Sequence, residues 1–321
     1  MRQLSQILNT PKFQQFMTDI ATKCSSVEYA KNIGTFIVQG WKNGLIDSQN
    51  WESVIDRINA INSFGDLPEQ NRGVFGATFH DESARHGLHV RVNPDLDEFH
   101  RRQYCFHELT HVILDGESEK VKGTVENEAG LDGSDHGDRA ILDDIEKGYT
   151  VIEESIAQEV SEMLVYSSYG LNRPSTNLQR DNAIGRIKFQ SNWHYYGLYH
   201  PMGIAFAKTF RGIGCLPETP NRNDVAMSLL CKKAFDGNFA NQICDEYDKD
   251  GCFLRLCQVL KKLGKVYGVK QASFGVGDVP YTQQSINMSE QAYSQAFDEL
   301  TELEDRRPPI SRQRNGIEID R

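Results

Sequence analysis

Residues 101–116 read RRQYCFHELTHVILDG, and this stretch decides how the rest of the chain is interpreted. Its apolar side chains recur at the three- and four-residue spacing of a helix. Gly116 can end that helix, because glycine readily takes the left-handed conformation found after a last turn. The stretch therefore predicts one helix that carries the pattern His-Glu-x-x-His at His107, Glu108 and His111.

This pattern suits a metal site with a base beside it. Side chains four positions apart on a helix share a face, so the imidazoles of His107 and His111 can reach one ion. Imidazole nitrogens are among the preferred ligands of Zn²⁺. Glu108 projects beside that ion, where a carboxylate can take a proton from a zinc-bound water. We therefore predict His107 and His111 as zinc ligands and Glu108 as a general base.

At these residues the chain resembles the zincin superfamily of metallopeptidases. The resemblance implies a zinc-dependent endopeptidase that hydrolyses peptide bonds of a polypeptide substrate. It also implies an α+β, mostly helical fold, with a small sheet beside the motif helix. The resemblance does not extend to the metzincins, whose longer motif has a glycine at the position of Leu114 and a third histidine at the position of Glu117.

A catalytic zinc site with two histidines needs one more protein ligand. Residues 150–166 have apolar side chains at helical spacing, and Glu154 lies among them. The segment from Glu154 to Ala157 has the pattern Glu-x-x-Ala, which resembles the third-ligand helix of gluzincins, including the ImmA/IrrE-type metallopeptidases. The resemblance therefore favours Glu154 as the third metal ligand.

Three other glutamates stay open as the third ligand. Residues 127–129, Asn-Glu-Ala, resemble a short motif of thermolysin-like enzymes and offer Glu128, while residues 123–126, Gly-Thr-Val-Glu, resemble the Gly-Thr-x-Asp of aspzincins and offer Glu126. The glycines that follow at 130 and 133 disfavour a helix there. Glu153, the neighbour of Glu154, is the remaining alternative.

Ring side chains gather in residues 193–201, WHYYGLYHP. In a zincin, the tetrahedral intermediate needs a hydrogen-bond donor for its oxyanion besides the metal, often a tyrosine or histidine. Tyr199 and His200 are the favoured candidates, because they directly precede a predicted helix, and His194, Tyr195 and Tyr196 are the others. The alternative is an aromatic cluster that only packs the core.

Two segments before the motif are typical of strands. Residues 74–80 and 87–93 flank a polar turn, which predicts a β-hairpin. In zincin-like folds the strand just before the motif helix forms the sheet edge on which an extended peptide lies. The resemblance therefore suggests residues 88–93 as a substrate-binding edge.

The wider pattern predicts four regions. Residues 1–65 form a helical layer, in which a last apolar face runs from Trp51 to Ile61. Residues 66–215 form the zincin-like catalytic core, and residues 216–305 form a C-terminal helical region. Residues 306–321 are polar, contain prolines and are expected to form a mobile tail.

Composition restricts the class of protein. The 321 residues are 39% hydrophobic and 25% charged, as in soluble globular proteins. No apolar run approaches a membrane span and no secretory signal is visible, so we expect a cytoplasmic protein without a membrane partner. Seven scattered cysteines indicate reduced thiols. The net charge of −10 disfavours a nucleic-acid partner and is compatible with a polypeptide one.

Two other functions remain open from the sequence. The first is a regulatory or binding protein that keeps a zincin-like but non-catalytic zinc site. Glu108 argues against it, because a purely structural site needs no base. The second is a bacterial effector protease, exported without a classical signal peptide to act in the cytosol of a host cell.

Overall fold

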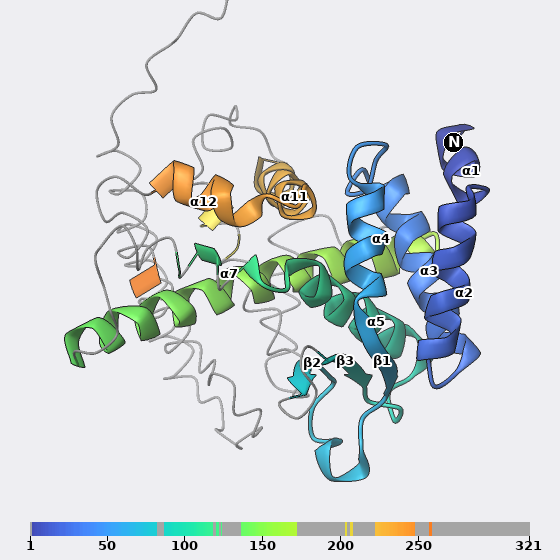
Figure 1. The fold of residues 1–321 in the computed structure, drawn as a ribbon, viewed down its shortest axis with the longest axis horizontal. Coiled ribbons are helices and arrows are strands. Elements are labelled where there is room, and N and C mark those ends of the chain that lie inside the picture. Colours follow the sequence, from blue (N-terminus) through green and yellow to red (C-terminus); the bar gives the residue numbers. More distant parts are fainter. Residues whose placement is uncertain are drawn as a thin grey trace, which may run out of the picture.

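The computed structural model describes residues 2–81, 87–117, 120–121, 123, 136–171, 203, 206–207, 222–247 and 257–258, and the structural statements below refer to these residues. They form a mostly helical structure with one small mixed sheet (Figure 1), which confirms the predicted α+β class. Among these helices none combines the length and apolar character needed to cross a membrane. The predicted tail at 306–321 lies outside the described residues, and the division into four regions stays a prediction.

Four helices precede the sheet: α1 (Arg2–Leu8), α2 (Pro11–Lys23), α3 (Val27–Lys42) and α4 (Trp51–Asn59). The hydroxyls of Thr10 and Ser26 begin α2 and α3 by accepting hydrogen bonds from the amides of Phe13 and Tyr29. Helical spacing predicts Ile61 on the apolar face of α4, and this is wrong. The helix ends at Asn59 and Ile61 begins strand β1, where it is fully buried.

Three strands form the sheet: β1 (Ile61–Asp66), β2 (Gly76–Asp81) and β3 (Gly87–Val92), with a short 3₁₀ helix, η1 (Glu69–Asn71), before β2. Strands β2 and β3 pair antiparallel, which confirms the predicted hairpin. The prediction that residues 88–93 form a sheet edge is wrong, because β1 pairs parallel with the other side of β3 and makes it the central strand. In the described sheet β2 is an edge.

The motif helix α5 (Glu98–Leu114) begins at Asp97, whose carboxylate accepts a hydrogen bond of 3.0 Å from the amide of His100. Strands β2 and β3, helices α3 and α4, and the 33-residue helix α7 (His136–Ser168) all pack against α5. Figure 1 shows α7 crossing the molecule with the sheet on one side of it and α11 (Arg222–Phe235) and α12 (Phe239–Tyr247) on the other. The motif helix is therefore central, and most of its last three turns are buried.

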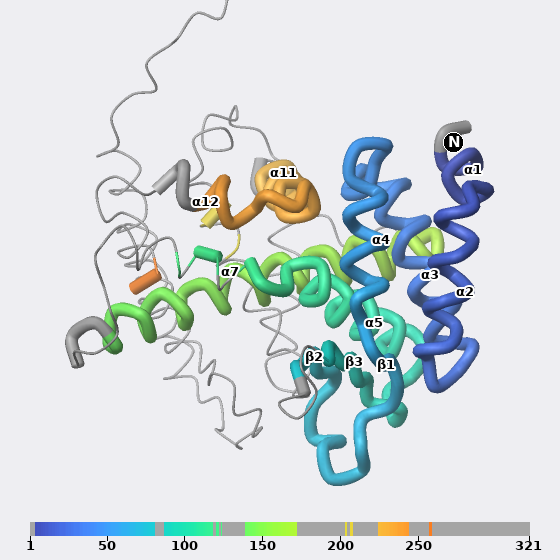
Figure 2. Tube along the Cα trace, viewed as in Figure 1, coloured from blue at the N-terminus to red at the C-terminus, as the bar shows by residue number. Residues whose placement is uncertain are grey.

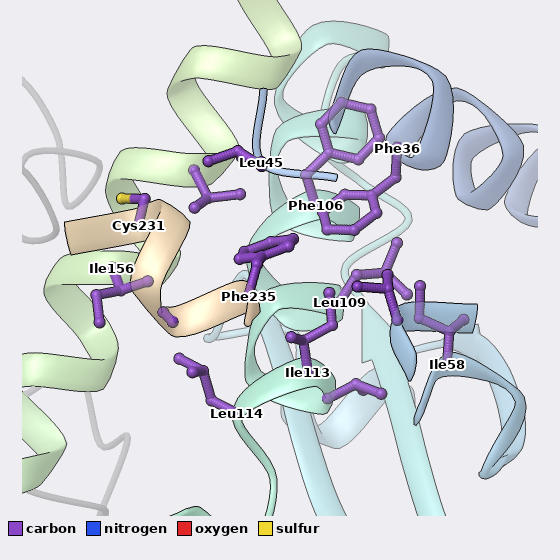
Figure 3. Close-up of a cluster of buried hydrophobic side chains, with 14 of the residues drawn as sticks. Phe36, Leu45, Ile58, Phe106, Leu109, Ile113, Leu114, Ile156, Cys231 and Phe235 are labelled. Atoms are coloured by element: carbon purple, nitrogen blue, oxygen red, sulfur yellow. The ribbon is translucent and has the colours of Figure 1, made fainter. Parts of the chain in front are cut away.

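One apolar core joins these elements. Figure 3 shows Phe106, Leu109 and Ile113 of α5 beside Phe36 of α3 and Phe235 of α11. The ring centroid of Phe36 lies 5.6 Å from that of Phe106 and 6.2 Å from that of Phe235. The trace in Figure 2 follows the chain from α4 into β1 and, through the hairpin, into α5, so the sheet is continuous in sequence with the motif helix. This packing sets the orientation of α5 about its own axis.

Candidate metal centre

His107 and His111 project from one face of α5, one turn apart. Their Nε2 atoms lie 3.1 Å from each other, and the two rings meet edge to face with centroids 4.8 Å apart. By helical periodicity this face lies nearly opposite the one that carries Phe106, Leu109 and Ile113. Because those three side chains are buried in the core, the imidazoles are directed away from it and toward α7.

Helix α7 brings a carboxylate to the same point. Oε2 of Glu154 lies 3.2 Å from Nε2 of His107, and Oε1 lies 3.6 Å from Nε2 of His111. One ligand atom from each of the three residues lies within 4.8 Å of the others, and this is the group of possible ligands found among the described residues that could hold a metal ion. The structure therefore brings together the three residues that the sequence analysis favoured as metal ligands.

The three side chains of the cluster differ in their exposure. The side chain of His107 is 2% exposed and that of Glu154 is 10% exposed, whereas that of His111 is 19% exposed. His111 is therefore the most exposed of the three side chains.

The three side chains are coupled electrostatically. Burial is the largest single influence on the Glu154 carboxyl and would raise its pKa, but the imidazoles of His111 and His107 together outweigh burial and hold that pKa well below its usual value. Burial would lower the pKa of His111, yet the Glu154 carboxylate raises it to about 9. Without a metal the pair is therefore ionised near neutral pH. A divalent cation can replace the imidazolium proton, because metal ligands bind in their deprotonated forms.

The donor set fits a cation between the helices. Oε2 of Glu154 is buried and accepts no well-aligned hydrogen bond from the described residues, although Nε2 of His107 is 3.2 Å away. A buried carboxylate oxygen without such a bond is unfavourable unless a positive charge satisfies it. Two imidazole nitrogens and one carboxylate oxygen can therefore hold a metal ion here, and the buried Oε2 supports that arrangement.

Glu108 occupies a separate place, against the edge strand β2. Its side chain is buried, and Oγ1 of Thr78 lies 2.8 Å from Oε2 and 3.2 Å from the backbone oxygen of the same residue. Burial raises the pKa of the Glu108 carboxyl, while His107, His111 and the Thr78 hydroxyl act in the opposite direction. A carboxyl with a raised pKa beside a group of possible metal ligands can act as a general base.

Tyr104 forms another wall of the site. It lies three residues before His107, its ring stacks on Phe75 with centroids 4.8 Å apart, and its centroid is 6.1 Å from that of His107. Burial raises the pKa of the Tyr104 hydroxyl, and the carboxylates of Glu162, Glu108 and Glu154 add to this. The phenol therefore stays protonated at neutral pH. Its helical spacing from His107 was the one signal in the sequence that could have identified it.

The remaining predicted site residues are Glu153, which the structure describes, and four residues that it does not describe. Glu153 is half-buried on α7, next to Glu154 but not among the three grouped ligands. Glu126, Glu128, Tyr199 and His200 lie outside the described residues. The nearest described residue after His200 is Gly203, where an added Cβ would lie 2.8 Å from Cβ of Ser155, the residue that follows Glu154.

Besides Tyr104, the sequence did not indicate two residues of the site, Gly76 and Thr78 of β2. They are two positions apart and so share one face of the strand. Alternation along the strand was visible in the sequence, but it does not say which helix that face meets. Only the packing of β2 on α5 brings both residues into contact with the side chain of Glu108.

Comparisons with known proteins leave the site to be interpreted by its chemistry. No protein-family model matches the chain, and no curated protein and no solved structure matches it either.

Proposed function

We propose that this protein is a zinc-dependent endopeptidase with a zincin-like core, in which His107, His111 and Glu154 hold the metal and Glu108 acts as general base. One observation carries the proposal. Two histidines of a His-Glu-x-x-His helix and a glutamate of a second helix converge within 4.8 Å, while the carboxylate of the motif glutamate is outside this group and contacts Thr78 of the neighbouring strand β2. This division into three ligands and one base is what hydrolysis at a metal requires.

The dimensions of the cluster support zinc. In a tetrahedral site with metal–ligand bonds of about 2.0–2.1 Å, neighbouring ligand atoms are about 3.3 Å apart. Nε2 of His107 lies near this distance from Nε2 of His111, at 3.1 Å, and from Oε2 of Glu154, at 3.2 Å, while the other carboxylate oxygen, Oε1, lies 3.6 Å from Nε2 of His111. Two imidazoles and one carboxylate are a common protein ligand set of catalytic zinc, which leaves a fourth position for water.

The chemistry divides between the metal and the protein. Bound zinc supplies a Lewis acid that acidifies water and polarises a carbonyl group. The Glu108 carboxylate accepts the proton of the attacking water and can donate it to the leaving amine. Its buried position supports this role, because a raised carboxyl pKa brings the base closer to neutral pH. Glu154 and the two histidines keep their positions through the packing of α5 on α7.

A polypeptide is the substrate class that the architecture favours. Strand β2 is an edge of the described sheet and touches Glu108 through Thr78, so an extended peptide paired with β2 would pass beside the base. This replaces the incorrect assignment of the substrate edge to residues 88–93. The net charge of −10 supports a polypeptide rather than a nucleic acid.

The donor for the oxyanion is proposed to come from Tyr199 or His200. The burial of Gly203, Phe206 and Ala207 supports this, because Gly203 lies against Ser155, the residue of α7 that follows Glu154. Replacing each ring separately, Tyr199→Phe and His200→Ala, assigns the donor. Replacement of the residue that is the donor is expected to lower kcat with little change in zinc content.

Metal analysis combined with a proteome-wide digest tests the proposed function. The purified protein is expected to hold about one zinc per chain and to create new peptide termini in a mixture of cellular proteins. Glu108→Gln is expected to keep the zinc and to lose those termini. A zinc-binding protein that cleaves nothing, in either form, would instead be the regulatory or binding protein considered from the sequence.

A further inference from the structure

Two residues of the edge strand β2 surround the carboxylate of Glu108. Gly76 and Thr78 lie on the face of the strand that packs on α5, and both contact this one side chain. The Thr78 hydroxyl carries a single proton, and its nearer acceptor is Oε2 of Glu108 at 2.8 Å. A hydrogen bond from a neutral hydroxyl to a carboxylate is charge-assisted and holds its acceptor in a defined direction.

Gly76 provides the space for the same carboxylate. A Cβ at this position would lie 2.5 Å from Oε1 of Glu108 and 2.9 Å from its Cγ. The backbone of Gly76 is not in the left-handed conformation, so an alanine there is opposed by the Glu108 side chain and not by the backbone. The close approach of strand and carboxylate therefore requires a residue without a side chain.

We infer that Thr78 and Gly76 are positioning residues, which hold the Glu108 carboxylate on β2 and apart from the metal ligands. The inference rests on the proposed function, because it explains why the carboxylate of Glu108, the proposed base, lies against β2. Glutamate has several rotatable bonds, and Glu108 is the immediate neighbour of His107. Freed from the strand, its carboxylate could turn toward the two imidazoles and occupy the position intended for water. A base must instead stay within hydrogen-bond reach of the proton that it accepts.

Two substitutions of Thr78 separate the effect of its hydroxyl group from the effect of its size. Thr78→Val removes the hydroxyl and keeps the shape of the side chain, whereas Thr78→Ser keeps the hydroxyl and removes a methyl group. Thr78→Val is expected to lower kcat by about tenfold to a hundredfold, the effect of losing a hydrogen bond to a charged group, with KM within about threefold. Thr78→Ser is expected to retain most of kcat, and all three proteins are expected to hold the same amount of zinc.

Gly76→Ala and Gly73→Ala form a matched pair. The added methyl group meets the Glu108 carboxylate at Gly76, whereas nothing lies within 4 Å of it at Gly73. We expect Gly76→Ala to lower kcat and Gly73→Ala to leave it unchanged. A kcat of Thr78→Val within about twofold of the parent, or a loss of zinc that parallels the loss of activity, would overturn the inference.

A double-mutant cycle tests the contact between Thr78 and Glu108 by a measurement that does not depend on enzymatic activity. Thr78→Val, Glu108→Ala and the double variant are compared by their urea midpoints in the metal-free protein. The shift caused by Thr78→Val is expected to be at least halved when Glu108 is already alanine. Equal shifts in both backgrounds would overturn the contact and the inference. Absence of Glu108-dependent cleavage by the parent would instead overturn the proposed function, whatever the cycle reports.

Discussion

Oε2 of Glu154 lies 3.2 Å from Nε2 of His107, although the two residues belong to different helices, α7 and α5. Neither helix alone makes a three-ligand site. Their packing brings a carboxylate and two imidazoles to one point, and α5 is oriented for this by its apolar contacts on the opposite face. The cluster therefore depends on the stability of the core as much as on the three side chains.

Replacement of Glu154 tests the identity of the third ligand. Glu154→Ala is expected to lower zinc affinity by more than about a hundredfold, because even the partners of zinc ligands contribute tenfold to a hundredfold. Glu153→Ala is the matched control and should change the affinity by less than about threefold. Competition with a chelating dye measures both. If Glu128→Ala or Glu126→Ala releases the metal and Glu154→Ala does not, the thermolysin-like or aspzincin-like arrangement is correct.

The ion pair between His111 and Glu154 predicts how the stability of the metal-free protein depends on pH. The pKa of His111 is raised from 6.5 to about 9, so its stabilisation is complete below pH 6.5 and is lost as the pH rises through 9. The pKa of Glu154 is lowered from 4.5, so its stabilisation is present above pH 4.5 and is lost in stronger acid.

Urea unfolding at several pH values measures this effect. The difference between the parent and Glu154→Gln in the free energy of unfolding should be largest between pH 4.5 and 6.5 and should decline toward pH 9. With saturating zinc the decline above pH 6.5 should disappear, because the metal takes the place of the proton. A difference that is the same at every pH would show that the pair does not form.

Replacement of Glu117 is expected to cause a large loss of stability. Its fully buried carboxylate accepts a hydrogen bond of 2.8 Å from the amide of Ala240 at the start of α12 and lies 3.3 Å from Nη2 of Arg57. Glu117→Ala is expected to lower the free energy of unfolding by about 2–4 kcal/mol, because it removes a fully buried carboxylate that pairs with Arg57 and leaves the amide of Ala240 without its acceptor. Denaturant titration checks this value. Asp95→Asn breaks an exposed ion pair with Arg72 and should change it by less than about 1 kcal/mol.

Gly148→Ala is expected to destabilise the protein, although helix propensity alone would favour alanine at this position. Alanine normally stabilises a helix relative to glycine by about 1 kcal/mol. A Cβ at Gly148, however, would lie 2.4 Å from Cα of Cys257, a backbone atom that cannot turn aside. Gly148→Ala should therefore lower the melting temperature. A rise in that temperature would mean that this close approach between α7 and Cys257 is not present in solution.

Glu117 also illustrates what a motif can exclude. A metzincin has a histidine at this position, and the sequence alone ruled that family out. The sequence did not indicate what the glutamate does instead. Besides Lys120, three residues further on, its partners are Arg57 and Ala240, which are far away in the chain and are joined to it only in the folded protein.

Local patterns of the sequence determined the helix with His107, Glu108 and His111, the helix with Glu154, and the hairpin before the motif. Each depends on hydrogen bonds and side-chain periods within a few residues, so a short window contains the information. The tertiary structure alone decided that Ile61 leaves its helix to start β1, that β3 is central and β2 an edge, and that Thr78 and Gly76 meet Glu108. These relationships arise from strand pairing and helix packing between distant segments, where the free energy of burial over the whole core outweighs local preference.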